Sequence, residues 1–347
     1  MSIDRRNFLK TMGLAVLAPT FGVARKSHSS PKSVLKPLRL KPGDTVGLIS
    51  PASPTFLHTD IKVAQESLTA LELKSKLGRH VFDRYGYLAG KDQDRAADVN
   101  AMFGDPSINA ILALGGGWGC NRILPLLDYD LIRRNPKIIM GYSDVTSLLL
   151  AIYAKTGLIT FHGPVGTSTW NKFSVEYVKK ILFNAEAVVM QNPTEVGDNL
   201  AQTRDRVETL TPGRARGVIA GGNLSLVSAM VGSAYLPEWK NKILFLEETN
   251  ENIYRVDRML TQLKLAGVLD QIAGFVFGKC TKCDPGEGFG SLTLEEVFND
   301  HIKPLGKPAW HGAMIGHIEN KFTVPIGVEV EIDADKGVIT MLEPAVS

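Results

Sequence analysis

Five short apolar runs alternate with helical stretches in the first half of the chain, and this alternation restricts the possible folds more than any other feature. The stretch after the first run places Ile61, Ala64, Leu68 and Leu71 at the spacing of one helix face. Short apolar runs between such stretches indicate buried strands, which form a mostly parallel sheet with helices on both faces. We therefore predict an α/β domain over residues 39–183. The runs cover residues 44–51, 80–82, 109–114, 137–142 and 158–164.

The pattern changes after Leu182. Residues 184–213 are polar and rich in loop-forming residues, which predicts an interdomain linker. Strand-like runs dominate the remainder, and the chain closes with an alternating hairpin over residues 324–342. These features predict a smaller, β-rich C-terminal domain over residues 214–347.

The N-terminus has the pattern of an export signal. Arg5 and Arg6 precede the sequence Asn-Phe-Leu-Lys, and a short apolar run that contains Pro19 leads to small residues ending at Ala24. This pattern predicts a twin-arginine signal peptide at residues 1–24, with a frayed amphipathic tail as the alternative.

After the signal we expect a solvated linker over residues 25–38. The apolar run of the signal is too short to span a bilayer, so we expect no stable membrane span after processing. The mature protein is then expected to be periplasmic, or otherwise exported through the twin-arginine pathway.

Composition and short motifs exclude several classes of function. The net charge of +3 over 347 residues gives no sign of nucleic-acid binding. The glycine-rich stretch lacks the GxGxxG and GxxxxGK[ST] spacings, and no His, Cys, Asp or Glu pattern has catalytic zinc spacing. We therefore expect neither a cofactor nor a metal. Cys280 and Cys283 are compatible with a disulfide in an oxidising compartment, and the sequence does not decide whether it forms.

Ser143 stands at a junction between a strand and a helix. Serine is a preferred helix N-cap, and the local sequence alone favours that role. The alternative is a nucleophile on a sharp strand–turn–helix elbow, although the second glycine of the G-x-S-x-G elbow is absent. The run Gly115–Gly119 ends a neighbouring strand, and parallel strands place their carboxyl ends at one ligand-binding edge. Its backbone N–H groups would suit an oxyanion hole, and a flexible connection is the alternative.

A serine nucleophile needs a base and a group that orients the base. Seven histidines are available, and composition does not choose among them; His162 ends a strand, and His317 lies near the C-terminus. Glu247 and Glu248 follow a buried apolar run, where a carboxylate is unusual.

A set of longer motifs makes the chain similar to the LD-carboxypeptidase family of serine peptidases, which includes muramoyltetrapeptide carboxypeptidases and microcin C self-immunity peptidases. The resemblance extends from about Leu40 to Leu342. The motifs are YGYLAGKDQDRAADVNAMF, GGGWG, LLDYDLIRRNPKIIMGYSDVTSLLLA, TFHGP, GGNLSLV, ILFLEE with YRVDRMLTQL, and GHIENKFTVPIG.

The resemblance implies a Ser–Glu–His triad, which residue by residue falls on Ser143, Glu247 and His317. It also implies an oxyanion hole made by backbone N–H groups of Gly116, Gly117 and Asp144. The family fold is an α/β domain with a smaller β-rich domain and the active site between them.

The resemblance further implies hydrolysis of the L,D bond between a diamino acid and a terminal D-Ala in peptidoglycan tetrapeptides. Peptidoglycan-derived peptides are then the expected partners, and a homodimer is an expectation from the family. Gly115 stands where many members have an arginine, which removes a bidentate partner for a carboxylate. The alternatives are a hydrolase of peptide–nucleotide antibiotics, for which Trp118 or Trp170 would stack a base, and a catalytically silent muropeptide-binding protein.

Overall fold

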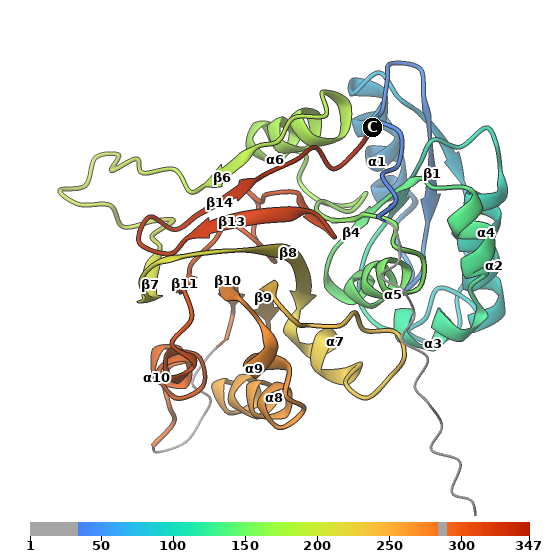
Figure 1. Ribbon diagram of the computed structural model, residues 1–347. Helices are drawn as coiled ribbons and strands as arrows, with labels where there is room; N and C mark the ends of the chain where they lie inside the picture. The colour runs from blue at the N-terminus through green and yellow to red at the C-terminus, as the bar shows by residue number, and fades with distance from the viewer. Residues whose placement is uncertain (1–33, 284–289) are drawn as a thin grey trace, which may run out of the picture. The chain divides into compact units, whose positions relative to one another are not determined.

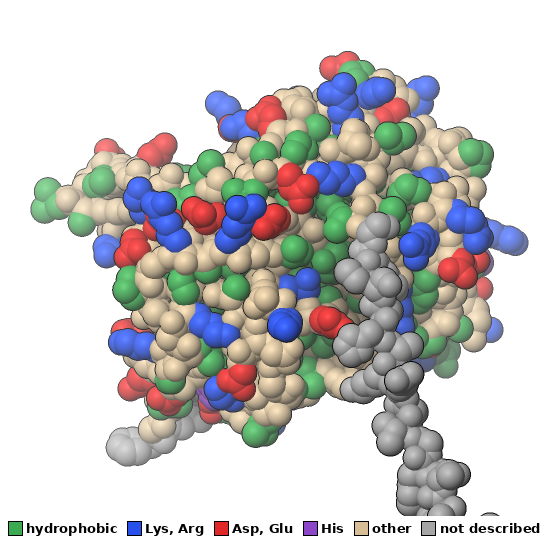
Figure 2. Space-filling model, viewed as in Figure 1, with side chains coloured by type: hydrophobic (Ala, Val, Ile, Leu, Met, Phe, Trp, Pro, Cys, Tyr) green, Lys and Arg blue, Asp and Glu red, His purple; other side chains and the backbone are tan. Residues whose placement is uncertain are grey.

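Two β-sheets, each with helices packed against it, make up the part of the chain described by this computed structural model (Figure 1). The structure describes residues 34–283 and 290–347, whose side chains Figure 2 colours by type. The predicted signal peptide, residues 1–24, and most of the predicted linker, residues 25–38, lie outside the described residues. Within the two described ranges, no helix is both long and apolar enough to cross a membrane.

The first sheet has six strands in the order β12-β5-β4-β3-β1-β2. The neighbours from β5 to β2 all run parallel, and β12 pairs with β5 in the antiparallel sense. Three of its parallel strands, β3, β4 and β5, are buried at every residue, as expected of strands covered on both faces. The strands are β1 (Thr45–Ile49), β2 (Lys74–Leu77), β3 (Ala110–Ala113), β4 (Ile138–Gly141), β5 (Thr160–His162) and β12 (Val324–Ile326).

Helices in this half follow the predicted alternation with the strands. On α2, for example, Ala96, Val99 and Phe103 recur on one face and are buried, because helical spacing brings them together against the sheet. The helices and helical turns are α1 (His58–Ala70), α2 (Asp92–Gly104), α3 (Cys120–Ile123), η1 (Leu124–Leu126), α4 (Tyr129–Arg134), η2 (Ser143–Val145), α5 (Thr146–Thr156), α6 (Lys172–Val178) and η3 (Lys179–Phe183).

One predicted strand is wrong. Residues 80–82 form a turn, and the strand of that region is β2, which begins at Lys74. Its sequence, Lys-Ser-Lys-Leu, has no buried residue because β2 lies at the edge of the sheet. Backbone pairing with β1 defines this strand, so its sequence shows no apolar run. Val81, by contrast, is buried although it lies in a turn, which explains why residues 80–82 resembled a strand.

The second sheet has eight strands in the order β6-β14-β13-β8-β9-β10-β11-β7. Its centre, from β8 to β11, is parallel, and antiparallel strands extend it on both sides. The strands are β6 (Val189–Gln191), β7 (Glu208–Thr211), β8 (Arg214–Asn223), β9 (Lys242–Thr249), β10 (Gly274–Thr281), β11 (Ala309–His311), β13 (Glu329–Asp333) and β14 (Val338–Met341). The helices are α7 (Leu224–Ala229), α8 (Ile253–Leu265), α9 (Val268–Gln271), α10 (Leu294–His301) and η4 (Lys303–Leu305).

The segment 184–213 differs from a simple linker. It contributes β6 and β7, which are the two edge strands of the second sheet. Both are short and partly exposed, and they join the sheet through backbone pairing rather than through an apolar run. The boundaries of the two domains, 39–183 and 214–347, stay a prediction, while the α/β class with a second β-rich part is confirmed.

Two contacts join the sheets close to the predicted site. Strand β12 comes from the C-terminal part of the chain yet completes the first sheet by pairing with β5. Helix α5 packs against β4 and β5 and also against β8, and the backbone N–H of Asn223, at the end of β8, donates to the Thr146 hydroxyl over 3.0 Å. The carboxyl ends of β4, β8 and β9 therefore meet beside the start of α5.

Candidate active site

Ser143 lies on a sharp turn between β4 and α5. Its φ is +64°, in the left-handed region that residues with a side chain rarely adopt. Its side chain caps neither the short helical turn that it begins nor α5, so the N-cap interpretation is wrong. Gly141 permits the turn, since a Cβ there would lie 2.8 Å from Cγ1 of Val145. The turn presents the Ser143 hydroxyl to the second half of the protein.

His317 and Glu247 approach Ser143 from that second half. Nε2 of His317 lies 3.0 Å from Oγ of Ser143, and Nδ1 of His317 lies 2.8 Å from Oε2 of Glu247. Glu247 belongs to β9 and is fully buried, while His317 lies in the loop between β11 and β12. Gly316 allows this approach, because a Cβ there would lie 2.7 Å from the same Glu247 oxygen. The structure thus brings the three predicted triad residues together.

The glycine loop lies directly against the serine. A Cβ added to Gly116 would be 2.8 Å from Cβ of Ser143 and 3.3 Å from the Asp144 nitrogen. Gly117 packs on Ser53 instead, where an added Cβ would meet the Ser53 hydroxyl. Among the residues that the structure describes, none accepts a hydrogen bond from the N–H of Gly116 or Gly117. Gly116 and Asp144 are therefore placed beside the nucleophile position, and Gly117 is one residue further along.

The Asp144 side chain ties the loop to the serine turn. Its Oδ2 accepts the backbone N–H of Cys120 over 2.8 Å, and the carboxyl group is 4% exposed. Burial raises the pKa of Asp144, and the hydrogen bond from Cys120 opposes that effect. Arg95, itself buried, donates to the carbonyl oxygen of Gly119 over 3.0 Å. The loop is thus fixed at its end by one acidic and one basic side chain.

A cleft of about 1010 Å³ contains the serine and the histidine. Tyr87, Trp118 and Arg122 line it from the first half of the chain, while Asn223 and Glu251 line it from the second half. Trp118 is 66% exposed, and its ring meets Tyr87 edge-on. By contrast, Trp170 does not line the cleft, and its indole N–H donates to the Gly166 carbonyl.

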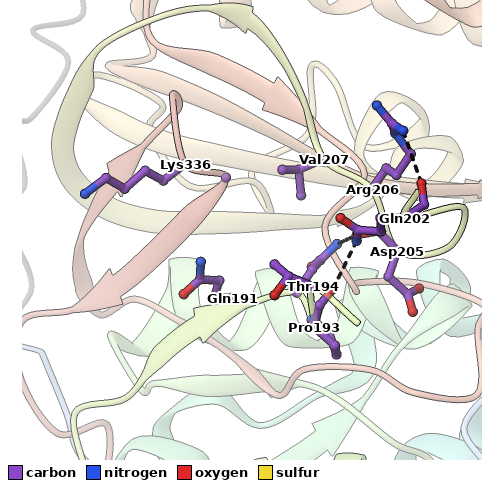
Figure 3. A pocket seen from close by; sticks show the side chains of 10 residues that line it. Gln191, Pro193, Thr194, Gln202, Asp205, Arg206, Val207 and Lys336 are labelled. Carbon is purple, nitrogen blue, oxygen red and sulfur yellow. Dashed lines mark hydrogen bonds between the residues drawn. The ribbon is translucent and has the colours of Figure 1, made fainter. Parts of the chain in front are cut away.

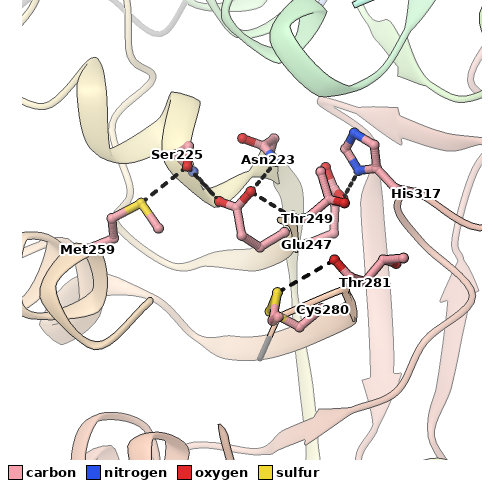
Figure 4. Close-up of a disulfide and its surroundings, with 10 residues drawn as sticks. Asn223, Ser225, Glu247, Thr249, Met259, Cys280, Thr281 and His317 are labelled. Atoms are coloured by element: carbon pink, nitrogen blue, oxygen red, sulfur yellow. Dashed lines mark hydrogen bonds and ion pairs between the residues drawn. A yellow bond between two sulfur atoms is a disulfide. The ribbon is translucent and has the colours of Figure 1, made fainter. Parts of the chain in front are cut away.

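Glu248, next to Glu247, has a structural role, and its partners Asn223, Ser225 and Thr249 are labelled in Figure 4. Its two carboxylate oxygens accept from the Asn223 amide, from the backbone N–H and the hydroxyl of Ser225, and from the backbone N–H of Thr249, over 2.8 to 3.0 Å. Burial raises the pKa of Glu248, and these donors oppose that effect. The carboxylate therefore holds the ends of β8 and β9 together beside the cleft.

A second polar group lies behind the triad. His162 is buried against Tyr142 and Phe245, and neither ring nitrogen has a partner among the described side chains and backbone. Burial lowers the pKa of His162 to about 4. The Lys321 ammonium lies 4.4 Å from the centre of the Tyr142 ring, and burial lowers its pKa to about 8 although Glu247 favours the charged form. His162, the rival base by sequence, is thus neutral and makes no hydrogen bond to Ser143, the contact that His317 makes.

Cys280 and Cys283 form a disulfide at the end of β10. Cys280 pairs with Glu248 of β9 in the sheet, so the disulfide lies close to the loop that follows Glu248 (Figure 4). Neither cysteine lines the cleft.

Two other features lie apart from the triad. Within the described ranges, His80, Asp83 and Asp94 form one group with metal-ligand atoms within 4.8 Å of one another, but His80 already bonds Asp83, and none of them lines the cleft. A smaller pocket of about 180 Å³ follows β6 and is lined by residues such as Gln191, Arg206 and Lys336 (Figure 3). None of the predicted site residues lines it.

Three charged residues near the site were not predicted. Arg122 is an exposed residue on the short helix α3, and Glu251 lies in a polar segment, so neither charge is unusual where it stands. Only the fold shows that both line the same cleft. Lys321 has a clearer signal, because it directly precedes the buried run Phe322–Val328.

The geometry suits acyl transfer. A hydroxyl on a strained turn, a histidine within hydrogen-bond distance of it, and a buried carboxylate on the other ring nitrogen form the arrangement with which serine hydrolases attack a carbonyl. Backbone N–H groups beside the hydroxyl suit the negative charge that develops on the carbonyl oxygen.

Comparisons with known proteins agree with this chemistry. The family models for the LD-carboxypeptidase N-terminal domain and the LD-carboxypeptidase C-terminal domain match residues 46–163 and 216–332. The chain is 39% identical to the probable murein peptide carboxypeptidase of Bacillus subtilis, over 86% of this chain and 91% of that protein. It is 30% identical to the murein tetrapeptide carboxypeptidase of Pseudomonas aeruginosa, over 84% of this chain and 94% of that protein.

A solved structure is also similar. The apo structure of the microcin C7 self-immunity protein MccF, a protein of Escherichia coli, matches with a TM-score of 0.81 and 30% identity, over 90% of this chain and 100% of that chain. The chain therefore belongs to the LD-carboxypeptidase family and is a serine-type carboxypeptidase.

Proposed function

We propose that the protein hydrolyses the L,D peptide bond between a diamino acid and the terminal D-Ala of peptidoglycan tetrapeptides, in murein turnover. The hydrogen-bonded series Ser143–His317–Glu247 carries this proposal, because it supplies a nucleophile, a base and an orienting carboxylate in one place. The names of the Bacillus and Pseudomonas relatives support the choice of a murein peptide as substrate.

In the proposed reaction, Oγ of Ser143 attacks the carbonyl carbon of the diamino acid while Nε2 of His317 takes the hydroxyl proton. The Glu247 carboxylate holds the ring and stabilises its charged form. The N–H groups of the glycine loop and of Asp144 stabilise the oxyanion. The carbon–nitrogen bond then breaks, and D-Ala leaves with the proton from His317. Water, deprotonated by the same ring, cleaves the acyl-enzyme and restores Ser143.

Arg122 suits the free carboxylate that defines a carboxypeptidase substrate. It is the one arginine or lysine among the described residues that line the cleft. Its Nε and one terminal nitrogen donate to both oxygens of Asp92, over 2.9 to 3.0 Å, which orients the guanidinium. The remaining donors are free to bind a carboxylate. Arg122 would thus supply a cation in a site where Gly115 replaces the family arginine.

The substrate assay tests the proposal. The purified enzyme should release D-Ala from a tetrapeptide that ends in a diamino acid and D-Ala, and Ser143→Ala should abolish this release while remaining folded. Loss of a triad nucleophile lowers the rate by several orders of magnitude. Ser233→Ala, at an exposed serine, is the control. A Ser143→Ala enzyme with a tenth of the wild-type turnover would contradict the nucleophile role.

A second candidate is hydrolysis of a peptide–nucleotide antibiotic, as the name of MccF suggests for that protein. The exposed Trp118 ring beside Tyr87 favours it, because an aromatic face in the cleft can stack a base. Cleavage of such a conjugate with no release of D-Ala from the tetrapeptide would support this second function. Binding of the tetrapeptide without any cleavage would instead indicate a silent binding protein.

We also propose that the protein is exported through the twin-arginine pathway to the periplasm. The paired Arg5 and Arg6 and the apolar run after them support export, and the disulfide between Cys280 and Cys283 is compatible with an oxidising compartment. Replacing both arginines by lysine keeps the charge but should leave uncleaved precursor in the cytoplasm. Normal periplasmic recovery of that double variant would contradict the proposal.

A further inference from the structure

Three carboxylates line the cleft that contains Ser143, and they differ in their burial and in the hydrogen bonds that they already accept from the protein. Asp144 is 4% exposed and accepts the Cys120 N–H. Glu248 is 2% exposed, and its oxygens accept from three neighbouring residues. Both side chains are thus almost fully buried, and the hydrogen bonds that they accept from the protein hold them in place.

Glu251 is different. Within the described residues it makes no hydrogen bond, and its one ion pair is a long contact of 3.5 Å between Oε2 and Nε of Arg255. The same Arg255 nitrogen donates to the hydroxyl of Tyr254 over 3.1 Å, so this arginine is shared. The Glu251 side chain is 22% exposed. Glu251 is therefore a partly desolvated carboxylate that faces the cleft with unused acceptor capacity.

The loop that carries Glu251 is held in place. Glu248 fixes its start through the backbone N–H of Thr249. Asn250 adopts a left-handed conformation with φ of +56°, and its N–H donates over 2.9 Å to the carbonyl of Thr281, next to the Cys280–Cys283 disulfide. Such anchoring fixes the position of Glu251 before a ligand arrives, which reduces the entropy lost on binding.

The two walls of the cleft carry opposite charge. Arg122 belongs to the first half of the chain, on the helix that follows the glycine loop, and Glu251 belongs to the second half, on the loop that follows β9. The proposed substrate has a matching arrangement, with a carboxylate on the leaving D-Ala and an ammonium on the side chain of the diamino acid. A neutral or acidic side chain on the acyl side would leave Glu251 unpaired or repelled.

We propose that Glu251 binds the side-chain ammonium of the diamino acid on the acyl side of the scissile bond and thereby determines the substrate class. This inference rests on the proposed function. Glu251 acts on specificity and takes no part in the proton transfers of Ser143 and His317.

The test compares two tetrapeptides that differ only in the acyl-side residue, which is either L-lysine, with a charged side chain, or Nε-acetyl-L-lysine, with an uncharged and larger one, each followed by D-Ala. Wild-type enzyme should hydrolyse the lysine peptide with the higher kcat/KM, by roughly 10- to 100-fold, as expected for a hydrogen-bonded ion pair. Glu251→Gln should lose most of that preference and change little against the acetylated peptide. Glu66→Gln, at an exposed position on α1, is the control and should keep the preference.

The outcomes separate this inference from the proposed function. If Glu251→Gln lowers kcat/KM equally for both peptides, or if the wild type does not distinguish them, the role of Glu251 is wrong while the peptidase function stands. If the wild type releases D-Ala from neither peptide, nor from one with diaminopimelate, the proposed function fails and this inference fails with it.

Discussion

Only one of the two oxygens of the buried Glu247 carboxylate is bonded: Oε2 lies 2.8 Å from Nδ1 of His317, and Oε1 has no partner among the residues that the structure describes. The hydrogen bond to His317 is thus the one that orients this carboxylate. A glutamate that served mainly to hold the sheet together would be bonded at both oxygens, as its neighbour Glu248 is.

The first prediction follows from this pairing. His317→Ala and Glu247→Ala should each remove most of the activity, and the double variant should lose little more, because one missing member disables the proton transfer that the others serve. Glu247→Gln should be milder, since it keeps the side-chain volume and loses only the charge. Measurement of kcat/KM for D-Ala release checks this. Additive losses in the double variant would show that the two residues do not act together.

The second prediction concerns the glycine loop. Gly116→Ala should lower kcat by a large factor while the protein stays folded. The new methyl group would lie 2.8 Å from Cβ and 3.0 Å from Oγ of Ser143 and would displace the hydroxyl. Loss of one oxyanion donor alone costs about 10²- to 10³-fold in kcat. Gly104→Ala, at the end of α2, is the control, because Gly104 has no positive φ and an added Cβ would lie 3.6 Å from Cδ2 of Leu131, an ordinary contact. Full activity of Gly116→Ala would place the oxyanion elsewhere.

The third prediction uses His162. His162→Gln should keep activity within about tenfold of wild type, because His317, and not His162, lies within hydrogen-bond distance of the Ser143 hydroxyl. The substitution should have a clearer effect on the pH dependence of the free energy of unfolding. Burial lowers the folded-state pKa of His162 from 6.5 to about 4, so between these values the unfolded chain binds a proton that the folded chain does not. This residue therefore makes the protein less stable as the pH falls through that window.

Urea unfolding measures this effect. From about pH 7 to about pH 4.5, the free energy of unfolding should fall by about 2 kcal/mol more in the wild type than in His162→Gln. An equal fall in both proteins would mean that His162 is not held neutral. An inactive but folded His162→Gln would mean that it takes part in the reaction.

The fourth prediction concerns Lys321. Burial lowers its folded-state pKa from 10.5 to about 8, so the unfolded chain binds more protons between these values. The cost of burying the ammonium is thus complete below about pH 8 and fades as the pH rises toward 10.5. The stability of Lys321→Met relative to wild type should therefore be highest at neutral pH. The free energy of unfolding of the variant minus that of the wild type should fall by about 2 kcal/mol between about pH 7.5 and pH 10. Denaturant unfolding at both pH values measures the difference, and a constant difference would contradict the prediction.

The apolar runs were sufficient to predict the parallel strands β1, β3, β4 and β5 of the first sheet and the edge at which the site lies. Ser143 and the glycine loop follow two of these runs, so their proximity follows from parallel topology alone. The edge strands β2, β6 and β7 could not be predicted in this way, because backbone pairing defines them and their side chains are mostly exposed or half-buried.

The partners of Ser143 needed more than local patterns. Nothing in the residues around His317 distinguishes it from the other histidines, and its position was predicted from the family motif. The structure supplies the physical reason: Gly316, with φ of +121°, lets His317 approach Glu247 closely. Arg122 and Glu251 were not predicted as site residues, because only the folded arrangement of their segments brings both of them to the cleft.

The pairing of β12 with β5 has a consequence for the order in which the protein becomes active. The first sheet lacks one edge strand until Val324–Ile326 has been synthesised, and His317 follows Ser143 by 174 residues in the chain. A nascent chain that ends between these two residues carries the Ser143 turn but neither His317 nor the finished sheet. If the triad acts as proposed, chains that stop before residue 326 are inert.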